Sequence, residues 1–70
     1  MRLSARNQIE GKIIEVRKGA TTAHVRVEIA SGRQVITSSI TNEAVEELDL
    51  KVGNDVIVVI KASDVMIGVA

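Results

Sequence analysis

The fold is decided by residues 23–30, which read AHVRVEIA. Apolar and polar residues alternate here with a period of two, which is typical of a β-strand with one buried face and one face in water. The apolar face is formed by Ala23, Val25, Val27 and Ile29. Ser31-Gly32 follows directly, and this pair predicts the turn of a hairpin.

Strand signals continue on both sides of this segment. Residues 9–16 are rich in β-branched side chains, and Lys18-Gly19 predicts the turn that ends them. Residues 35–40 predict the third strand. Residues 56–60 are apolar at every position, so we expect them to be buried on both faces, with the second face against another subunit. Residues 65–69 predict a fifth strand.

One short helix is predicted between the third and fourth strands. Thr41 or Asn42 can cap it, and Glu43 lies in its first turn. An apolar stripe at helical spacing is formed by Ala44, Val45 and Leu48. This element order predicts an all-β fold, a small five-stranded OB-like barrel with a helix over residues 42–48. The chain is expected to be a single domain over residues 1–70.

Composition limits how such a small barrel is stabilised. The chain has 70 residues, 46% of them apolar, and no Phe, Tyr or Trp, so no large ring anchors its core. It has no cysteine, which excludes disulfides and Cys-rich metal staples. Oligomerisation is the remaining common remedy, and we therefore expect a homo-oligomer.

Charge and hydropathy narrow the classes of partner. Nine basic residues balance nine acidic ones, and nucleic-acid binders normally carry a basic face. OB-like barrels that hold single strands also use aromatic stacking platforms, which this chain lacks. Neither a signal peptide nor a membrane-spanning run is present in the sequence. We therefore expect a cytoplasmic protein that binds neither nucleic acid nor membrane.

Catalytic and metal-binding residues are sparse. There is no cysteine nucleophile, and the single histidine, His24, falls on the polar face of an alternating strand, where it is expected to face solvent or an interface. Catalysis requires partners within hydrogen-bond reach of such a group, and no spacing in the sequence supplies them. The carboxylates are scattered without the spacing of a metal site. We expect neither an enzyme nor a bare metal site, and no cofactor.

Two compact polar clusters remain as candidates for binding. The first is Ser4-Ala5-Arg6-Asn7-Gln8, ahead of the first strand, and the second is Lys61-Ala62-Ser63, after the fourth. Each combines a hydroxyl, a cation and a small alanine that lets an anion approach backbone N–H groups. These are the donors that a tetrahedral dianion requires. The alternative interpretation is that Arg6 and Lys61 are ordinary solvated charges.

The two clusters resemble the opening and closing motifs of the molbindin (Mop) family of TOBE-type domains. The opening motif is Ser4-Ala5-Arg6-Asn7-Gln8-Ile9-x-Gly11, and the closing motif is Lys61-Ala62-Ser63-x-Val65. Three further matches fall between them in the family's order and spacing: Gly19-Ala20, Ile40-Thr41 and Leu48-x-Leu50-x-x-Gly53. The resemblance covers almost the whole chain.

The resemblance implies a small cytoplasmic protein with an OB-like fold that binds molybdate, and usually tungstate, for storage, buffering or homeostasis. The family assembles as a hexamer, a trimer of dimers, with oxoanions bound between subunits. The chain is similar to the free-standing form, although related copies occur within regulators and transport ATPases. An alternative role is therefore a molybdate-responsive protein-interaction module.

The resemblance also implies two kinds of ligand-binding site. The main site would consist of Ser4, Ala5, Arg6, Lys61, Ala62 and Ser63, with Thr41 as a further hydroxyl donor. A second site near a threefold axis would use the loop after the first strand, with Gly19, Ala20 and Thr22. The family more often has Asn where this chain has Thr22, whose side chain is shorter.

Overall fold

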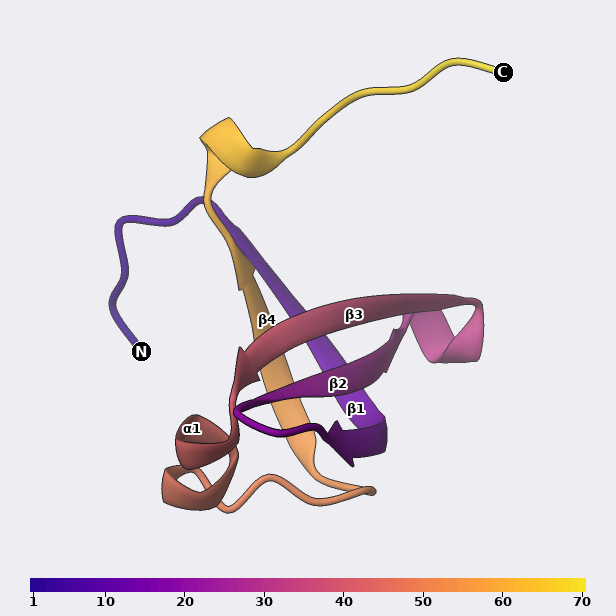
Figure 1. The fold of residues 1–70 in the computed structure, drawn as a ribbon. Coiled ribbons are helices and arrows are strands. Elements are labelled where there is room, and N and C mark those ends of the chain that lie inside the picture. Colours follow the sequence, from indigo (N-terminus) through magenta and orange to yellow (C-terminus); the bar gives the residue numbers. More distant parts are fainter.

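A computed structural model describes residues 1–70, which form one antiparallel sheet with the strand order β3-β2-β1-β4 (Figure 1). The strands and the helix are β1 (Asn7–Lys18), β2 (Thr22–Ile29), β3 (Gln34–Thr41), α1 (Asn42–Glu47) and β4 (Asp55–Ile60). Two short 3-10 turns complete the chain, η1 (Ala30–Gly32) between β2 and β3 and η2 (Ala62–Asp64) after β4. The predicted hairpin, the four strands before residue 61 and the single helix are confirmed.

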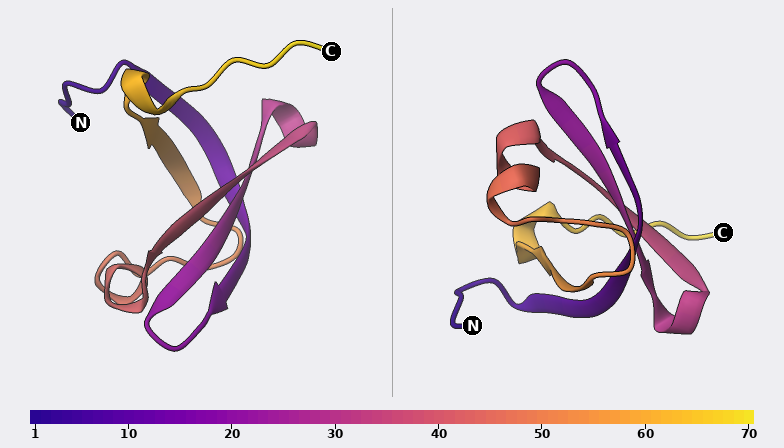
Figure 2. Two further views of the ribbon diagram at one scale, coloured as in Figure 1. Left: turned by 45° about the horizontal axis from the view of Figure 1, so that its top comes forward. Right: turned by 90° about the horizontal axis from the view of Figure 1, so that it is seen from below.

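The long strand β1 is shared between two partners. Its first half pairs with β4 from Asn7 to Lys12, and its second half pairs with β2 from Lys12 to Lys18. A β-bulge at Ile14 interrupts the register and bends the strand, so that the sheet curls around one face (Figure 2). Gly11 allows β1 to approach β2 closely, because a Cβ at this position would lie 2.5 Å from Cγ1 of Val27.

The core lies inside this curl and is small. Five residues are buried, and all are aliphatic: Ile13, Ala23, Val25, Val27 and Val45. The alternation that predicted β2 is confirmed, because three of these five residues are its inward positions. On β4, Val56 and Val58 pack on the core, whereas Ile57 is 46% exposed and Val59 41% exposed. The second face of β4 is therefore uncovered in the single chain.

The helix α1 closes one end of the curl. Its N-cap is Thr41, whose Oγ1 accepts a hydrogen bond of 3.0 Å from the backbone N–H of Ala44. Val45 is the residue of α1 that enters the core. The helix ends at Glu47, with Leu48 as its C-cap, and the next residue, Asp49, has a φ of +52° and so leaves the helical conformation. No helix in the structure has the length and apolarity to cross a membrane.

The fifth strand predicted over residues 65–69 is not formed within the single chain, and the sheet stays open rather than closing into a barrel. After η2 the C-terminal segment, residues 65–70, runs away from the sheet (Figures 1 and 2). Met66, Ile67 and Val69 are 92%, 87% and 96% exposed. A strand forms only where its backbone can pair with the free edge of another strand. Residues 65–70 run away from the sheet after η2 and lie beside no such edge.

Candidate functional site

The pairing of β1 with β4 brings the two sequence clusters together. Asn7 at the start of β1 is opposite Ile60 at the end of β4, so the residues just before β1 lie beside those just after β4. Nδ2 of Asn7 donates a hydrogen bond of 3.2 Å to the carbonyl of Ile60 across this junction. Nε2 of Gln8 donates to the carbonyl of Ala5 at 3.2 Å and fixes the preceding turn. Antiparallel register alone therefore joins residues that are far apart in sequence.

A surface hollow lies at this junction. It is lined by Ser4, Ala5, Arg6, Val59, Lys61, Ala62, Ser63 and Asp64. The six residues predicted from the two clusters all contribute to it. Asp64 was not predicted, although its place directly after Ser63 in a short turn could have suggested it. We refer to this hollow as the junction hollow.

Cations and donors at the junction hollow have no partners within the chain. Neither Arg6 nor Lys61 takes part in the four ion pairs of the molecule. In η2, Asp64 donates its N–H to the carbonyl of Lys61 at 2.9 Å, whereas the N–H groups of Ala62 and Ser63 donate to no acceptor in the chain. Two positive charges, two hydroxyls and two backbone donors therefore converge where an anion could be bound.

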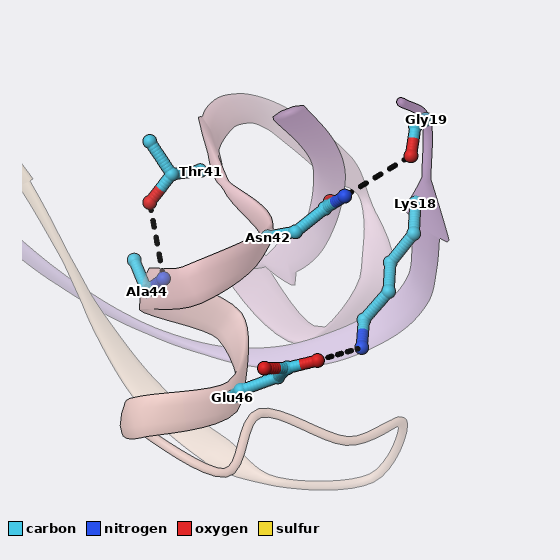
Figure 3. A network of polar contacts seen from close by, with 6 residues as sticks. All are labelled: Lys18, Gly19, Thr41, Asn42, Ala44 and Glu46. Atoms are coloured by element: carbon cyan, nitrogen blue, oxygen red, sulfur yellow. Dashed lines mark hydrogen bonds and ion pairs between the residues drawn. The ribbon is translucent and has the colours of Figure 1, made fainter. Parts of the chain in front are cut away.

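Thr41 lies apart from the junction hollow within one chain. It is opposite Thr22 in the β2–β3 ladder and is the N-cap of α1. The helix α1 lies at the other end of the sheet from η2 (Figure 1). The structure thus groups Thr41 with the loop that was predicted as a second site. Its Oγ1 accepts the cap bond from Ala44, and its hydroxyl hydrogen is left free to donate (Figure 3).

The second predicted cluster is residues 19–22, which comprise the turn between β1 and β2 and the first residue of β2, and which we call the β1–β2 loop. Gly19 donates its N–H to the carbonyl of Thr22 at 2.7 Å, which closes the loop tightly. Gly19, Ala20 and Thr22 are all exposed. The loop is fastened to the first residue of α1, Asn42, whose Nδ2 donates to the carbonyl of Gly19 at 3.0 Å (Figure 3).

The remaining polar side chains that could bind a metal ion or transfer a proton are scattered over the molecule. His24 is exposed on β2, between Arg17 of β1 and Ser39 of β3, as its place in the alternating pattern predicted. No group of three or more His, Cys, Asp or Glu side chains is gathered where it could hold a metal ion.

Comparison with known proteins identifies the family. The model of the TOBE domain matches residues 3–67. The chain belongs to the TOBE family. Among relatives of this TOBE domain, Molybdenum-pterin-binding protein 1 of Clostridium pasteurianum is 51% identical over 67 residues, which cover 96% of this chain and 97% of the relative. The resemblance to the Mop group that the motifs indicated is thereby confirmed.

Solved structures agree with the architecture of this TOBE domain. MopII from Clostridium pasteurianum, in an apo form, matches with a TM-score of 0.89 at 47% identity, over 97% of this chain and 100% of that one. The cytoplasmic molybdate-binding protein ModG, with molybdate bound, matches with a TM-score of 0.93 at 46% identity. That match covers 100% of this chain and 49% of ModG.

Proposed function

We propose that this protein binds molybdate, and tungstate with it, and that it stores or buffers the oxoanion in the cytoplasm rather than catalysing a reaction. The observation that carries the proposal is the junction hollow, where two unpaired cations meet unengaged hydroxyl and backbone donors. ModG is named a molybdate-binding protein and the relative in Clostridium pasteurianum a molybdenum-pterin-binding protein, and both names support the choice of a molybdenum oxoanion.

Each group at the junction hollow has a separate role in this proposal. Arg6 and Lys61 supply the positive charge that a dianion needs on leaving water. The hydroxyls of Ser4 and Ser63 donate to oxygens of the anion. Ala5 and Ala62 are small, so the ligand can approach the backbone closely. No cofactor and no bare metal ion takes part.

The name of the relative in Clostridium pasteurianum includes a pterin, and this ligand is a second candidate. A flat heterocycle is commonly held by stacking on an aromatic ring. The chain has no Phe, Tyr or Trp that could serve as such a platform. The free oxoanion therefore fits the residues of this chain better than a pterin conjugate does.

We also propose that the protein self-associates, as a hexamer built from a trimer of dimers. The C-terminal segment, residues 65–70, is apolar, and its Met66, Ile67 and Val69 are almost fully exposed, while β3 and β4 are both free edges of the open sheet. Between these edges lies an apolar hollow lined by side chains that include Val25, Ile40, Leu50, Val56 and Val58. The C-terminal segment of a second copy would complete the five-stranded barrel there.

Self-association would also complete the anion sites. Most residues that line the junction hollow are exposed, and such an open site binds a dianion in competition with bulk water. A neighbouring copy would exclude this water, and it would offer Thr41 as the additional hydroxyl donor. The β1–β2 loop, with Gly19, Ala20 and Thr22, would form the second kind of site between copies.

The first test is calorimetric titration of the purified protein with molybdate, tungstate, sulfate and phosphate, and with a molybdenum–pterin conjugate. We expect binding of molybdate and tungstate. Arg6→Ala and Lys61→Ala should each weaken molybdate binding about ten- to a hundredfold, because one charge-assisted bond to an enclosed dianion contributes ~1.5–3 kcal/mol.

Lys51→Ala is the matched control, because Lys51 is also exposed but pairs with Asp49 away from the junction hollow. It should leave the affinity unchanged. Retained affinity in both Arg6→Ala and Lys61→Ala would refute the assigned site. If the protein binds the pterin conjugate but not free molybdate, the conjugate and not the free oxoanion is its ligand.

A molybdate-responsive interaction module is the alternative function. Leu48 and Val52, on and after the end of α1, are 67% and 65% exposed, and apolar side chains of this kind are available to a protein partner. The same anion site would then act as the switch. A pull-down from cell extract, with and without molybdate, distinguishes the two functions, because an anion-independent result removes the switch.

A further inference from the structure

The β1–β2 loop is held by one residue of α1 through two separate hydrogen bonds. Nδ2 of Asn42 donates to the carbonyl of Gly19 at 3.0 Å (Figure 3). The backbone N–H of Asn42 donates to the carbonyl of Thr21 at 2.9 Å. An ion pair of 3.3 Å between Lys18 and Glu46 joins the same two elements nearby. Both ion-pair side chains are exposed, at 46% and 70%, so the ion pair contributes little, and the two hydrogen bonds of the half-buried Asn42 are the main connection between α1 and the loop.

These bonds divide the polar groups of the loop into two sets. Its carbonyls are engaged, since Gly19 and Thr21 accept from Asn42 and Thr22 accepts from Gly19. The N–H groups of Ala20 and Thr21 donate to no acceptor in the chain. Three of the four carbonyls in the loop are therefore already hydrogen-bonded, whereas two of its N–H groups are free to donate. Such a loop favours binding of an anion over binding of a cation.

Asn42 itself has an unsatisfied acceptor. Its Oδ1 is buried and has no hydrogen-bond partner. Turning the amide over would direct Oδ1 at the carbonyl of Gly19 and lose the donor, so the hydrogen bond to Gly19 fixes the orientation. An unpaired buried acceptor opposes folding by at least as much as one typical hydrogen bond supports it. The net contribution of the side chain to stability is therefore small, and its effect lies in the shape of the loop.

We propose that Asn42 is a positioning residue, which holds the β1–β2 loop in the conformation that presents its N–H groups and the Thr22 hydroxyl to a tetrahedral oxoanion. The inference rests on the second site of the proposed function. It adds a residue that contacts the loop rather than the ligand. Asn42 acts on the loop through the carbonyl of Gly19.

The test is a molybdate titration of the ¹⁵N-labelled full chain followed by amide chemical shifts. In the wild type, Ala20, Thr21 and Thr22 should shift saturably, as should Ala62 and Ser63 at the junction hollow. Asn42→Asp keeps the size of the side chain but removes the donor to Gly19. It should weaken the loop response at least fivefold while the response of Ala62 and Ser63 changes less than twofold.

Two further variants separate positioning from stability. Asn42→Ala removes the hydrogen bond and the unpaired acceptor together, so its thermal midpoint should stay close to that of the wild type while the loop response weakens. Lys18→Met removes the exposed ion pair with Glu46 but keeps both bonds of Asn42. It should leave the loop response unchanged.

The outcomes are distinguishable. An unchanged loop response in folded Asn42→Asp and Asn42→Ala overturns the inference, and so does an equal loss in Lys18→Met. If the wild-type loop is silent while Ala62 and Ser63 respond, the inference fails and the junction hollow stands. If neither region responds, the proposed function fails as well.

Discussion

Arg6, Lys61 and Asp64 bring three charges to the junction hollow, and none of them forms an ion pair, although four ion pairs form elsewhere on the molecule. The two cations are consequently available to a ligand. The carboxylate of Asp64 has the same sign as the proposed ligand and lowers the attraction that a dianion experiences there. An oxoanion store must release its content, and a carboxylate beside the site moderates affinity.

Asp64→Asn tests this role of the carboxylate. We expect molybdate affinity to rise about three- to tenfold, because the variant removes one negative charge from a partly screened site. The gain should shrink in high salt, which calorimetry at two ionic strengths measures. Asp55→Asn is the control, because Asp55 lies at the other end of β4 beside Lys12. Equal or weaker binding by Asp64→Asn would contradict the prediction.

At the scale of elements, the end of α1 carries local strain. Asp49 has a φ of +52°, a conformation that glycine adopts without steric cost. The carbonyls of the last turn still find partners, because Leu50 donates its N–H to the carbonyl of Val45 at 3.0 Å. The backbone therefore makes the usual hydrogen bonds of a helix end, although Asp49 is less suited than glycine to the left-handed conformation that they require.

Asp49→Gly should relieve this strain. We expect the free energy of unfolding to rise by about 1 kcal/mol, since the left-handed conformation is unfavourable for residues with a Cβ. The lost ion pair with Lys51 is exposed and offsets little of the gain. Chemical denaturation measures the change. Asp49→Ala, which keeps the Cβ, should not stabilise the protein, and stabilisation by both variants would assign the effect to charge.

The elements that the sequence predicted correctly are those in which apolar residues recur with the period of a strand or a helix and so form one buried face. The alternation of β2 and the stripe of α1 are periodic, and both are found where expected. Thr41 rather than Asn42 is the cap, a choice that composition left open. The bulge at Ile14 was not predicted, because the sequence around it shows no break in β-branched residues. The missing fifth strand depends on a pairing edge, which no local pattern encodes.

The candidate site was also predictable in part from the sequence. Clusters at the start of one strand and the end of another meet when those strands pair, and the ladder of β1 and β4 brings the two clusters together. Asp64 was missed because a carboxylate is not a ligand for an anion. The separation of Thr41 from the junction hollow depends on the curl of the sheet, which the spacing of residues does not define.

At the scale of the whole molecule, the single chain leaves two surfaces that match. The C-terminal segment is apolar and exposed, and an apolar hollow lies between β3 and β4, the two edge strands of the sheet. A core of five buried residues is small for a chain of 70. Association of copies is therefore the expected source of much of the stability.

A chain ending at Asp64 tests the role of the C-terminal segment. It should sediment or scatter as a smaller species than the full chain, and its thermal midpoint should no longer rise with protein concentration. Molybdate affinity should fall even though every residue of the junction hollow is present. A chain lacking only Ala70 is the control. An unchanged mass for the shortened chain would show that assembly uses another surface.

The C-terminal segment is joined to the sheet only through Lys61 and η2, the same residues that line the junction hollow. In an assembly built through that segment, an anion is fully enclosed only after copies have met. By mass action, occupancy then follows the abundance of the protein as well as that of the anion. A cell that makes few copies would hold its oxoanion loosely, and one that makes many would hold it tightly, so gene expression itself would set the free concentration at which the reservoir fills.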